Sequence, residues 1–348
     1  MKKFVTNSKN ILPVDEKKYL KPFLTSTNIN TRYWESPPEN NMSDTYLTSK
    51  LMQIHQLLDM FKSLDIDFKN KNFLDIGTGN AFLPKALLCI TNLKSATGAD
   101  PFQSNENASN HQPNNTEENF NSFIRYVKNF NRKKISYTLY KKYCHEKAEK
   151  ETFIPQDHKL GKINYSKLKN YNFKPYGAHD LKKLNKKFDL IYCKAIEHIP
   201  NWKKVFENLS LVSKKNTIVY FKHRSFFSYL GPHRYASTAI PWGHVLLNDK
   251  EYKKYAEKFH KTRSKKMIND FFSNLSYPRN SVSEMTQMMS KYGFSLKCIK
   301  VETPPYVKKI TKFTNEINNF WKIVNKNYPN LNSDELFSSI HHIVFERN

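Results

Sequence analysis

The chain contains little cysteine. Its four cysteines, among 348 residues, are scattered without a C-x-x-C pair or a repeated spacing, at Cys89, Cys144, Cys193 and Cys298. Zinc sites are usually indicated by paired cysteines, or by cysteines and histidines at fixed spacings. We therefore expect free thiols and no metal site, with Cys89 and Cys193 as small core residues.

Long apolar runs are also missing. No stretch reaches the roughly 18 apolar residues that a membrane-spanning helix requires. The first ten residues are basic, but no apolar segment follows them, which argues against a secretory signal. These absences predict a protein with a cytoplasmic location and no membrane span.

Acidic residues are few relative to basic ones. The 57 lysines and arginines outnumber the 31 aspartates and glutamates, so the formal net charge is +26. Basic chains often bind nucleic acid. However, only 8 of these residues are arginines, the side chain that binds phosphates and bases bidentately. The lysine excess is better explained by an AT-rich coding sequence and a solvated surface than by a site for a polyanion. Nucleic acid is therefore a possible partner that we do not favour.

The length is sufficient for one large domain. We predict an irregular N-terminal segment over residues 1–43 and a single domain over residues 44–348. The domain opens with apolar residues at steps of three and four, which predicts an amphipathic helix. These residues are Leu47, Leu51, Ile54, Leu58 and Phe61.

The most informative stretch is NFLDIGTGNA, residues 72–81. An apolar run that contains Asp75 meets Gly77 and Gly79, and a helical segment follows, which predicts a strand, a tight turn and a helix. Glycines at such a turn let backbone N–H groups and the helix N-terminus approach a ligand. A second acid, Asp100, ends the next apolar segment. Its spacing fits a carboxylate that binds two ribose hydroxyls.

These residues resemble the first motif, D/E-x-G-x-G-x-G, of the class I S-adenosylmethionine-dependent methyltransferases. The motif reads DIGTGNA from Asp75 to Ala81, so alanine in the last place adds one methyl group. The resemblance implies an α/β fold, a doubly wound and mostly parallel seven-stranded sheet with helices on both faces. It also implies S-adenosylmethionine as cofactor, with Asp75, Gly77, Gly79 and Asp100 in its binding site.

A second block carries the same resemblance. The sequence FDLIYCKAIEHI, residues 188–199, matches the F-D-x-[IVL] strand and the E-H-[IVL] loop of the family. The turn before it corresponds to the adenine-binding turn, although the usual leading acid falls at Gly177. The resemblance adds Ala178, Asp180 and Cys193 to the cofactor contacts.

Residues 103–173 are an insertion relative to a minimal fold, because a crossover between neighbouring parallel strands is normally one helix. Its first part, residues 103–119, is polar and is expected to be a loop. Residues 120–172 alternate between aromatic and lysine-rich positions. We predict a helical or irregular insertion after the second strand, which either caps the substrate or elaborates the surface.

Four histidines are candidates for catalysis. The loop after a predicted strand at residues 216–221 carries His223, His233 and His244 at the carboxyl end of that strand, where α/β sheets bind ligands. The alternative is that this loop packs on the body and its histidines are incidental. His198 is the fourth candidate, although its E-H pair caps the following helix in many enzymes of the resembled family. A neutral histidine suits a proton acceptor near pH 7.

Methyl transfer from a sulfonium is an in-line displacement, and most of the acceleration can come from positioning the acceptor. We expect transfer to oxygen or nitrogen of a small molecule or a sugar-containing precursor. The alternatives are an RNA methyltransferase that uses the basic insertion, and a non-catalytic cofactor-binding protein of the same fold. The sequence leaves the acceptor and the oligomeric state open.

Overall fold

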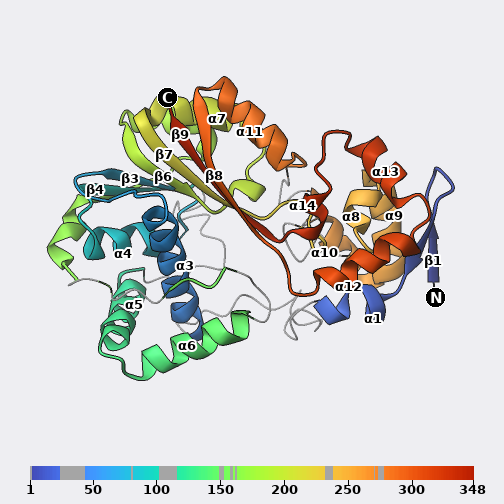
Figure 1. Cartoon of the computed structure of the whole chain (residues 1–348), viewed down its shortest axis with the longest axis horizontal. Helices are drawn as coiled ribbons and strands as arrows, with labels where there is room; N and C mark the ends of the chain where they lie inside the picture. Colours follow the sequence, from blue (N-terminus) through green and yellow to red (C-terminus); the bar gives the residue numbers. More distant parts are fainter. Residues whose placement is uncertain are drawn as a thin grey trace.

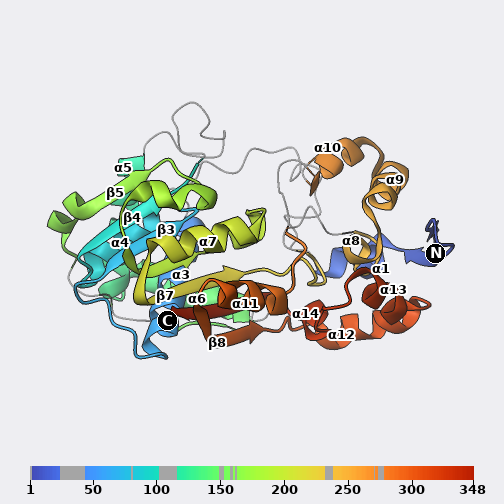
Figure 2. The ribbon, with the colours of Figure 1, turned by 90° about the horizontal axis from the view of Figure 1, so that it is seen from above.

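The computed structural model describes most of the chain. The described residues are 2–23, 44–79, 81–101, 116–148, 153–156, 160, 163–231, 238–269, 271–272 and 278–348. Two lobes stand side by side in this structure, one built around a β-sheet and the other mainly helical (Figures 1 and 2).

A seven-stranded sheet forms the centre of the larger lobe. Its strands are β3 (Asn72–Ile76), β4 (Ser95–Ala99), β5 (Tyr171–Lys174), β6 (Phe188–Cys193), β7 (Ser213–His223), β8 (Phe294–Glu302) and β9 (Ile340–Arg347). They lie in the order β5-β4-β3-β6-β7-β9-β8. Only β9 runs antiparallel to its neighbours in the described sheet. The predicted doubly wound, mostly parallel α/β sheet is confirmed, and its strand order reverses between β3 and β6.

Helices cover both faces of the sheet, which is why its central strands are apolar throughout rather than alternating. One face is packed by α3 (Asp44–Lys62), α4 (Phe82–Ile90), α5 (Thr116–Asn131) and α6 (Ile135–Ala148). The other face is packed by the 3-10 helix η4 (Ala178–Leu184), α7 (Trp202–Val212) and α11 (Val282–Lys291). None of the helices in the described ranges combines the length and apolar character needed to cross a bilayer.

The described part of the insertion belongs to the helical layer beside α3. The aromatic residues of α5 and α6 are buried against α3 and α4, among them Phe123, Phe130 and Tyr140. His55 of α3 shares a 2.7 Å hydrogen bond with the Tyr140 hydroxyl. A short 3-10 helix, η3 (Tyr165–Asn170), then leads into β5. The predicted helical insertion after the second strand is therefore present.

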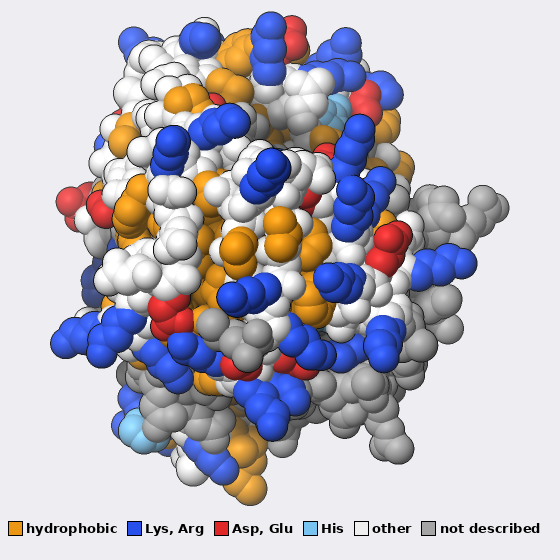
Figure 3. Space-filling view, turned by 90° about the vertical axis from the view of Figure 1, so that its right-hand side faces the viewer, with side chains coloured by type: hydrophobic (Ala, Val, Ile, Leu, Met, Phe, Trp, Pro, Cys, Tyr) orange, Lys and Arg blue, Asp and Glu red, His pale blue; other side chains and the backbone are white. Residues whose placement is uncertain are grey.

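The second lobe gathers three distant segments around one apolar cluster. Its elements are β1 (Lys2–Val5), β2 (Ile11–Val14), α1 (Glu16–Tyr19), η1 (Lys21–Phe23), α8 (Gly243–Leu246), α9 (Asp249–His260), η6 (Lys261–Arg263), α10 (Ser264–Asn269), α12 (Val307–Thr311), η8 (Lys312–Glu316), α13 (Phe320–Asn327) and α14 (Asp334–Phe337). On the face shown in Figure 3, lysine and arginine side chains are spread widely rather than gathered in one groove.

The N-terminal segment is a correction to the sequence prediction. We expected residues 1–43 to be irregular, but β1 and β2 form an antiparallel hairpin in which Lys2 pairs with Val14. Phe4 and Tyr19 are buried in the second lobe. Four-residue strands are too short to show a reliable hydrophobic period, and Phe4 of β1 packs against Tyr255, which lies in a distant segment of the chain. Residues 24–43 lie outside the described part.

A buried carboxylate joins the second lobe to the sheet lobe. Glu335 of α14 accepts hydrogen bonds from the Ser225 hydroxyl at 3.0 Å and from the backbone N–H of Val282 at 2.9 Å. Burial raises the pKa of Glu335 to about 7, although both hydrogen bonds lower it, and the charge of Glu284 raises it further. The interface between the lobes thus contains a titratable group.

We expect Glu335→Gln to stabilise the protein by about 1–3 kcal/mol near pH 8 and to change stability little near pH 5. The folded-state pKa lies above the unfolded value of 4.5. Folding therefore favours the protonated acid, and the wild-type protein loses stability as pH rises from the unfolded pKa through the folded pKa. Thermal unfolding of both proteins at the two pH values measures the effect. The same difference at both values would contradict the assignment to Glu335.

A chain of polar side chains is buried between β7, β8 and β9. His342 Nε2 donates to Glu302 Oε1 at 2.7 Å, and its Nδ1 accepts from the Tyr220 hydroxyl at 2.6 Å. The Glu302 and His342 side chains are 1% and 0% exposed. Burial raises the pKa of Glu302, but the hydrogen bond from His342 and the charge of Lys222 outweigh burial and leave that pKa below its usual value. A neutral His342 thus donates a hydrogen bond to the charged carboxylate of Glu302.

Candidate active site

The glycine turn after β3 is fixed by hydrogen bonds to the neighbouring strand. Gly77 N–H donates to the Ala99 carbonyl at 2.8 Å, and Gly79 N–H donates to Asp100 Oδ2 at 2.9 Å. Gly77 has a φ of +70°, and a Cβ there would lie 2.8 Å from the Cβ of Ala195. Glycine is therefore required at this position, both for its backbone conformation and for the close approach of the loop after β6.

The alanine that replaces the last glycine of the motif is unfavourable because of its backbone conformation. Ala81 precedes α4 with a φ of 57°, in the left-handed region, and caps the helix without a side-chain hydrogen bond. A non-glycine residue in this region is strained by roughly 1–2 kcal/mol. We expected the extra methyl group to have only a small effect. The cost at this position comes instead from the backbone conformation.

Asp100 and the turn before η4 lie together at the carboxyl ends of β4 and β5. Asp100 N–H donates to the Lys174 carbonyl at 3.1 Å, which joins the ends of the two strands. A Cβ added at Gly177 would lie 3.6 Å from Pro101, so this turn packs next to the acid. The turn that begins at Gly177 therefore lies next to Pro101, the residue that follows Asp100.

Two of the predicted cofactor contacts have their own surroundings. Asp180 forms an ion pair with Lys183 at 3.0 Å, and its side chain is 43% exposed. Cys193 ends β6 opposite Ile76 of β3 and is buried in the sheet. Burial raises the pKa of the Cys193 thiol well above its usual value, so the thiol is protonated and is not a nucleophile.

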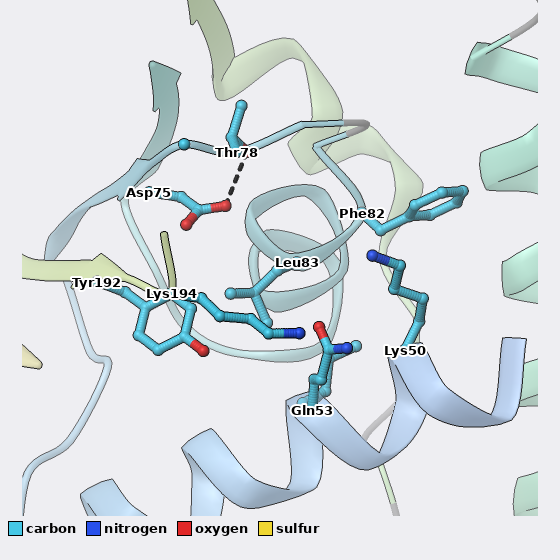
Figure 4. Close-up of a pocket in the computed structure, with 10 residues that line it drawn as sticks. Lys50, Gln53, Asp75, Thr78, Phe82, Leu83, Tyr192 and Lys194 are labelled. Atoms are coloured by element: carbon cyan, nitrogen blue, oxygen red, sulfur yellow. Dashed lines mark hydrogen bonds between the residues drawn. The ribbon is translucent and has the colours of Figure 1, made fainter. Parts of the chain in front are cut away.

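A pocket of about 90 Å³ opens between α3 and the ends of β3 and β6. Figure 4 shows Lys50, Gln53, Asp75 and Lys194 among the side chains that line it. Asp75 is 4% exposed, and its Oδ2 accepts a 2.7 Å hydrogen bond from the Thr78 hydroxyl. One carboxylate and two ammonium groups therefore share a small polar cavity next to the glycine turn.

The enclosure of this pocket shifts its charged groups toward neutrality. Burial raises the pKa of Asp75 to about 7, while the Thr78 hydrogen bond and the charge of Lys50 lower it. Lys194 remains accessible from the pocket, but protein surrounds it on most sides, and this desolvation lowers its pKa to about 7. Positive charges on Lys222, Lys50 and Arg224 lower the pKa of Lys194 further.

Two of the four predicted catalytic histidines are buried. His244 belongs to the second lobe, where its Nε2 lies 2.9 Å from the Phe226 carbonyl and 3.1 Å from that of Ser228. An Nε2 that donates to these carbonyls holds the loop together, so we assign His244 a structural role. His223 ends β7 with 0% exposure and packs against the Trp202 ring at 5.5 Å. Neither can reach an acceptor without a rearrangement, and His233 lies outside the described residues.

His198 is the remaining described candidate, and it reaches the surface with Glu197. Both belong to the 3-10 turn η5 (Ile196–His198). The expectation that this pair caps the next helix is not met, because Asn201 is the N-cap of α7 and its side chain accepts from Lys204 N–H. Burial lowers the pKa of His198 to about 4 and raises that of Glu197 to about 7.

Sequence reasoning did not single out Lys50, Lys194 or Arg224, and it considered Glu197 only as part of the E-H pair with His198. Lys194 follows β6 directly and Arg224 follows β7 directly. Their position just after a parallel strand was the available signal, because ligands bind at the carboxyl ends of such strands. Lys50 lies on α3, and nothing local distinguishes it from the other lysines. Among the described residues, no three His, Cys, Asp or Glu side chains are grouped to hold a metal ion.

Comparison with known proteins identifies the family of this chain. A family model described as a methyltransferase domain matches residues 49–299. The YcgJ protein from Bacillus subtilis is a similar solved structure, with 13% identity and a TM-score of 0.39 over 84% of this chain and 99% of that one. Another is a magnesium protoporphyrin IX methyltransferase from Synechocystis PCC 6803 with bound SAH, with 10% identity and a TM-score of 0.37 over 96% and 100%.

A search of curated proteins finds no significant match. The matched family region covers the glycine turn, both acids, the loop after β6 and the end of β7. The resemblance to class I methyltransferases that the sequence indicated is confirmed. The chain belongs to the methyltransferase-domain family, whose members use S-adenosylmethionine.

Proposed function

We propose that this protein methylates an oxygen or nitrogen atom of a small molecule or a sugar-containing precursor. The observation that carries the proposal is the grouping of Asp75, Asp100 and the polar pocket around one glycine turn. S-adenosylmethionine, when bound, supplies a methyl group on a positively charged sulfur. Everything else in the reaction depends on how the chain binds, orients and desolvates the two reactants.

The residues present fit this cofactor. We assign Asp100, at the end of β4, to the ribose hydroxyls and the neighbouring turn at Gly177 and Ala178 to the adenine. The methionine end carries one ammonium and one carboxylate. In the pocket, Asp75 supplies an acceptor for the ammonium, and Lys50 and Lys194 supply donors for the carboxylate. The described structure gives the Lys194 ammonium no hydrogen bond or ion pair of its own.

A small acceptor is favoured over RNA by the state of the insertion. Proteins that bind single-stranded nucleic acid stack bases on exposed aromatic rings. In the described insertion, Phe120, Phe123, Tyr126 and Phe130 are instead buried in the sheet lobe. These rings are therefore unavailable for stacking, and the lysines that remain form a dispersed basic surface.

Calorimetry with S-adenosylmethionine and its demethylated product tests the cofactor assignment. We expect both to bind to the wild-type protein, and we expect extracted metabolites to become labelled when the methyl group is radioactive. Absence of binding would overturn the proposal. Labelling of RNA in a reaction that falls steeply with salt would instead favour the RNA methyltransferase.

Affinity for S-adenosylmethionine is expected to peak near pH 7. Below the pKa of Asp75 the carboxylate is protonated and loses the ammonium, so affinity falls by up to about tenfold per pH unit. Above the pKa of Lys194 the amine is neutral and loses the carboxylate. Lys50, Lys194 and Asp100 are the charged groups that act on Asp75. Calorimetry across this range measures the profile.

Lys194→Met separates the two limbs of this profile. The variant keeps the length of the side chain but carries no charge, so we expect the alkaline limb to disappear and the acidic limb to remain. An unchanged alkaline limb would show that another group binds the carboxylate. Lys203, which is exposed on α7, is the matched position for a control Lys203→Met.

A further inference from the structure

An arginine without a partner lies at the carboxyl end of β7, beside the pocket. Arg224 directly follows β7 and is partly buried. Its guanidinium makes no hydrogen bond and no ion pair with any residue in the described ranges. Its positive charge acts on Lys194, Glu197, His198 and Tyr306. β6 and β7 pair in parallel with Cys193 opposite Phe221, so Arg224 leaves the sheet at the same edge as the loop that carries Lys194 and Glu197.

One carboxylate oxygen of a glutamate in the same region also lacks a partner. Glu197 Oε2 is buried and accepts no hydrogen bond in the structure. Arg224, Lys194 and Lys222 all act on this carboxylate, yet none of them forms an ion pair with it. Arg224 and Glu197 therefore lie in the same region without forming an ion pair with each other.

Such a pair is costly unless something bridges it. A buried polar group without a hydrogen bond is unfavourable by about 1–3 kcal/mol, and a charged one by more. Lys194 and Arg224 leave the same edge of the sheet as Glu197 and both act on its carboxylate, so this region favours a ligand group with negative charge. A ligand that completes this region carries a negative group for the arginine and a hydrogen-bond donor for the glutamate.

We propose that the methyl acceptor is a small oxyanion, a carboxylate or phosphate, that binds Arg224 through its anionic group and donates a hydrogen bond from a hydroxyl or a neutral amine to Glu197. The lone pair of that oxygen or nitrogen forms the new bond to the methyl carbon as the methyl–sulfur bond of S-adenosylmethionine breaks, and the proton passes to the Glu197 carboxylate. This inference rests on the proposed function, because it identifies the substrate class of the same site. Arginine is suited to the task because its planar fork binds both oxygens of such a group. Arg224 determines specificity, and Glu197 orients the group that receives the methyl.

Chemical modification tests anion binding without any turnover. Phenylglyoxal reacts with accessible arginines, and peptide mass spectrometry gives the rate at each position in one digest. We expect inorganic phosphate or acetate, but not chloride at equal ionic strength, to slow modification of Arg224. At a tenfold excess over the dissociation constant the protection is about tenfold. Arg125, which is exposed on α5, is the control in the same sample.

The result that overturns the proposal is equally direct. Equal modification of Arg224 with and without either anion, or equal protection of Arg224 and Arg125, would show that no oxyanion site exists there. Protection by phosphate alone or by acetate alone distinguishes the two acceptor chemistries. Because the measurement needs no cofactor, its outcome is independent of whether S-adenosylmethionine binds.

Product charge is the second measurement. Metabolites labelled from radioactive S-adenosylmethionine are separated on an anion exchanger, and we expect the label in the retained fraction. Arg224→Gln should lower that label at least tenfold, Arg224→Lys should lower it less, and Arg125→Gln should leave it unchanged. Calorimetry with S-adenosylmethionine should give the same affinity for Arg224→Gln as for wild type. Label confined to neutral or cationic products would overturn the proposal.

Discussion

Asp100→Ala is expected to weaken S-adenosylmethionine binding by roughly 10²–10⁴-fold. A hydrogen bond to a charged group contributes about 1.5–3 kcal/mol, and the carboxylate is placed for two ribose hydroxyls. The substitution also removes the acceptor of the 2.9 Å hydrogen bond from Gly79 N–H, which holds the glycine turn against β4. Calorimetry with the purified variant measures the loss.

Asp100→Asn separates the two contributions. The amide oxygen can still accept from Gly79 N–H, but the amide carries no charge and offers one acceptor fewer to the ribose. We expect an intermediate loss and an unchanged thermal midpoint. A variant that binds S-adenosylmethionine as tightly as wild type would show that the ribose lies elsewhere, and the placement of the cofactor would be wrong.

His342→Ala is expected to destabilise the fold by about 3 kcal/mol or more, because leaving a buried group without its hydrogen bond costs about 1–3 kcal/mol and a charged group costs more. The substitution leaves the Glu302 carboxylate, with its side chain 1% exposed, without its 2.7 Å donor. It also removes the acceptor of the Tyr220 hydroxyl. Urea unfolding of wild type and variant gives the difference in free energy.

The same two strands supply a matched control. Lys297 of β8 and Glu346 of β9 form an ion pair at 2.9 Å, but their side chains are 34% and 33% exposed. Lys297→Ala is expected to cost less than about 1 kcal/mol, because water screens a surface pair. Equal costs for the two variants would mean that burial of Glu302 does not determine the effect.

The cofactor half of the site was predictable because it is local. Asp75, Gly77 and Gly79 lie within one strand and one turn, and a glycine at a φ of +70° leaves a direct mark on the sequence. Asp100 and the block at 188–199 end the strands on either side of β3. Strand ends can be read from apolar runs, so the sheet and its ligand edge followed from the sequence.

The acceptor half was not predictable, because it depends on which side chains face the site. We predicted His223 and His244 in the loop after a strand, but His223 is the last residue of β7, His244 lies in α8, and both side chains are buried. Glu197, Lys194 and Arg224 carried the same signal of following a strand, but no residue type singled them out. Which side chains point into the site is decided by packing between segments that are far apart in the chain.

The sequence by itself determined the α/β sheet and the family, and it indicated the residues that we propose for the cofactor, because each depends on short-range patterns of apolar runs and glycines. Only the tertiary structure decided that residues 2–23 join the second lobe. It also decided that His244 is buried against a loop carbonyl and does not serve as a proton acceptor. It also brought Glu197 and Arg224 to one place. Contacts between segments hundreds of residues apart produce no repeating pattern in the sequence, because each segment has to fit only the one surface that it packs against.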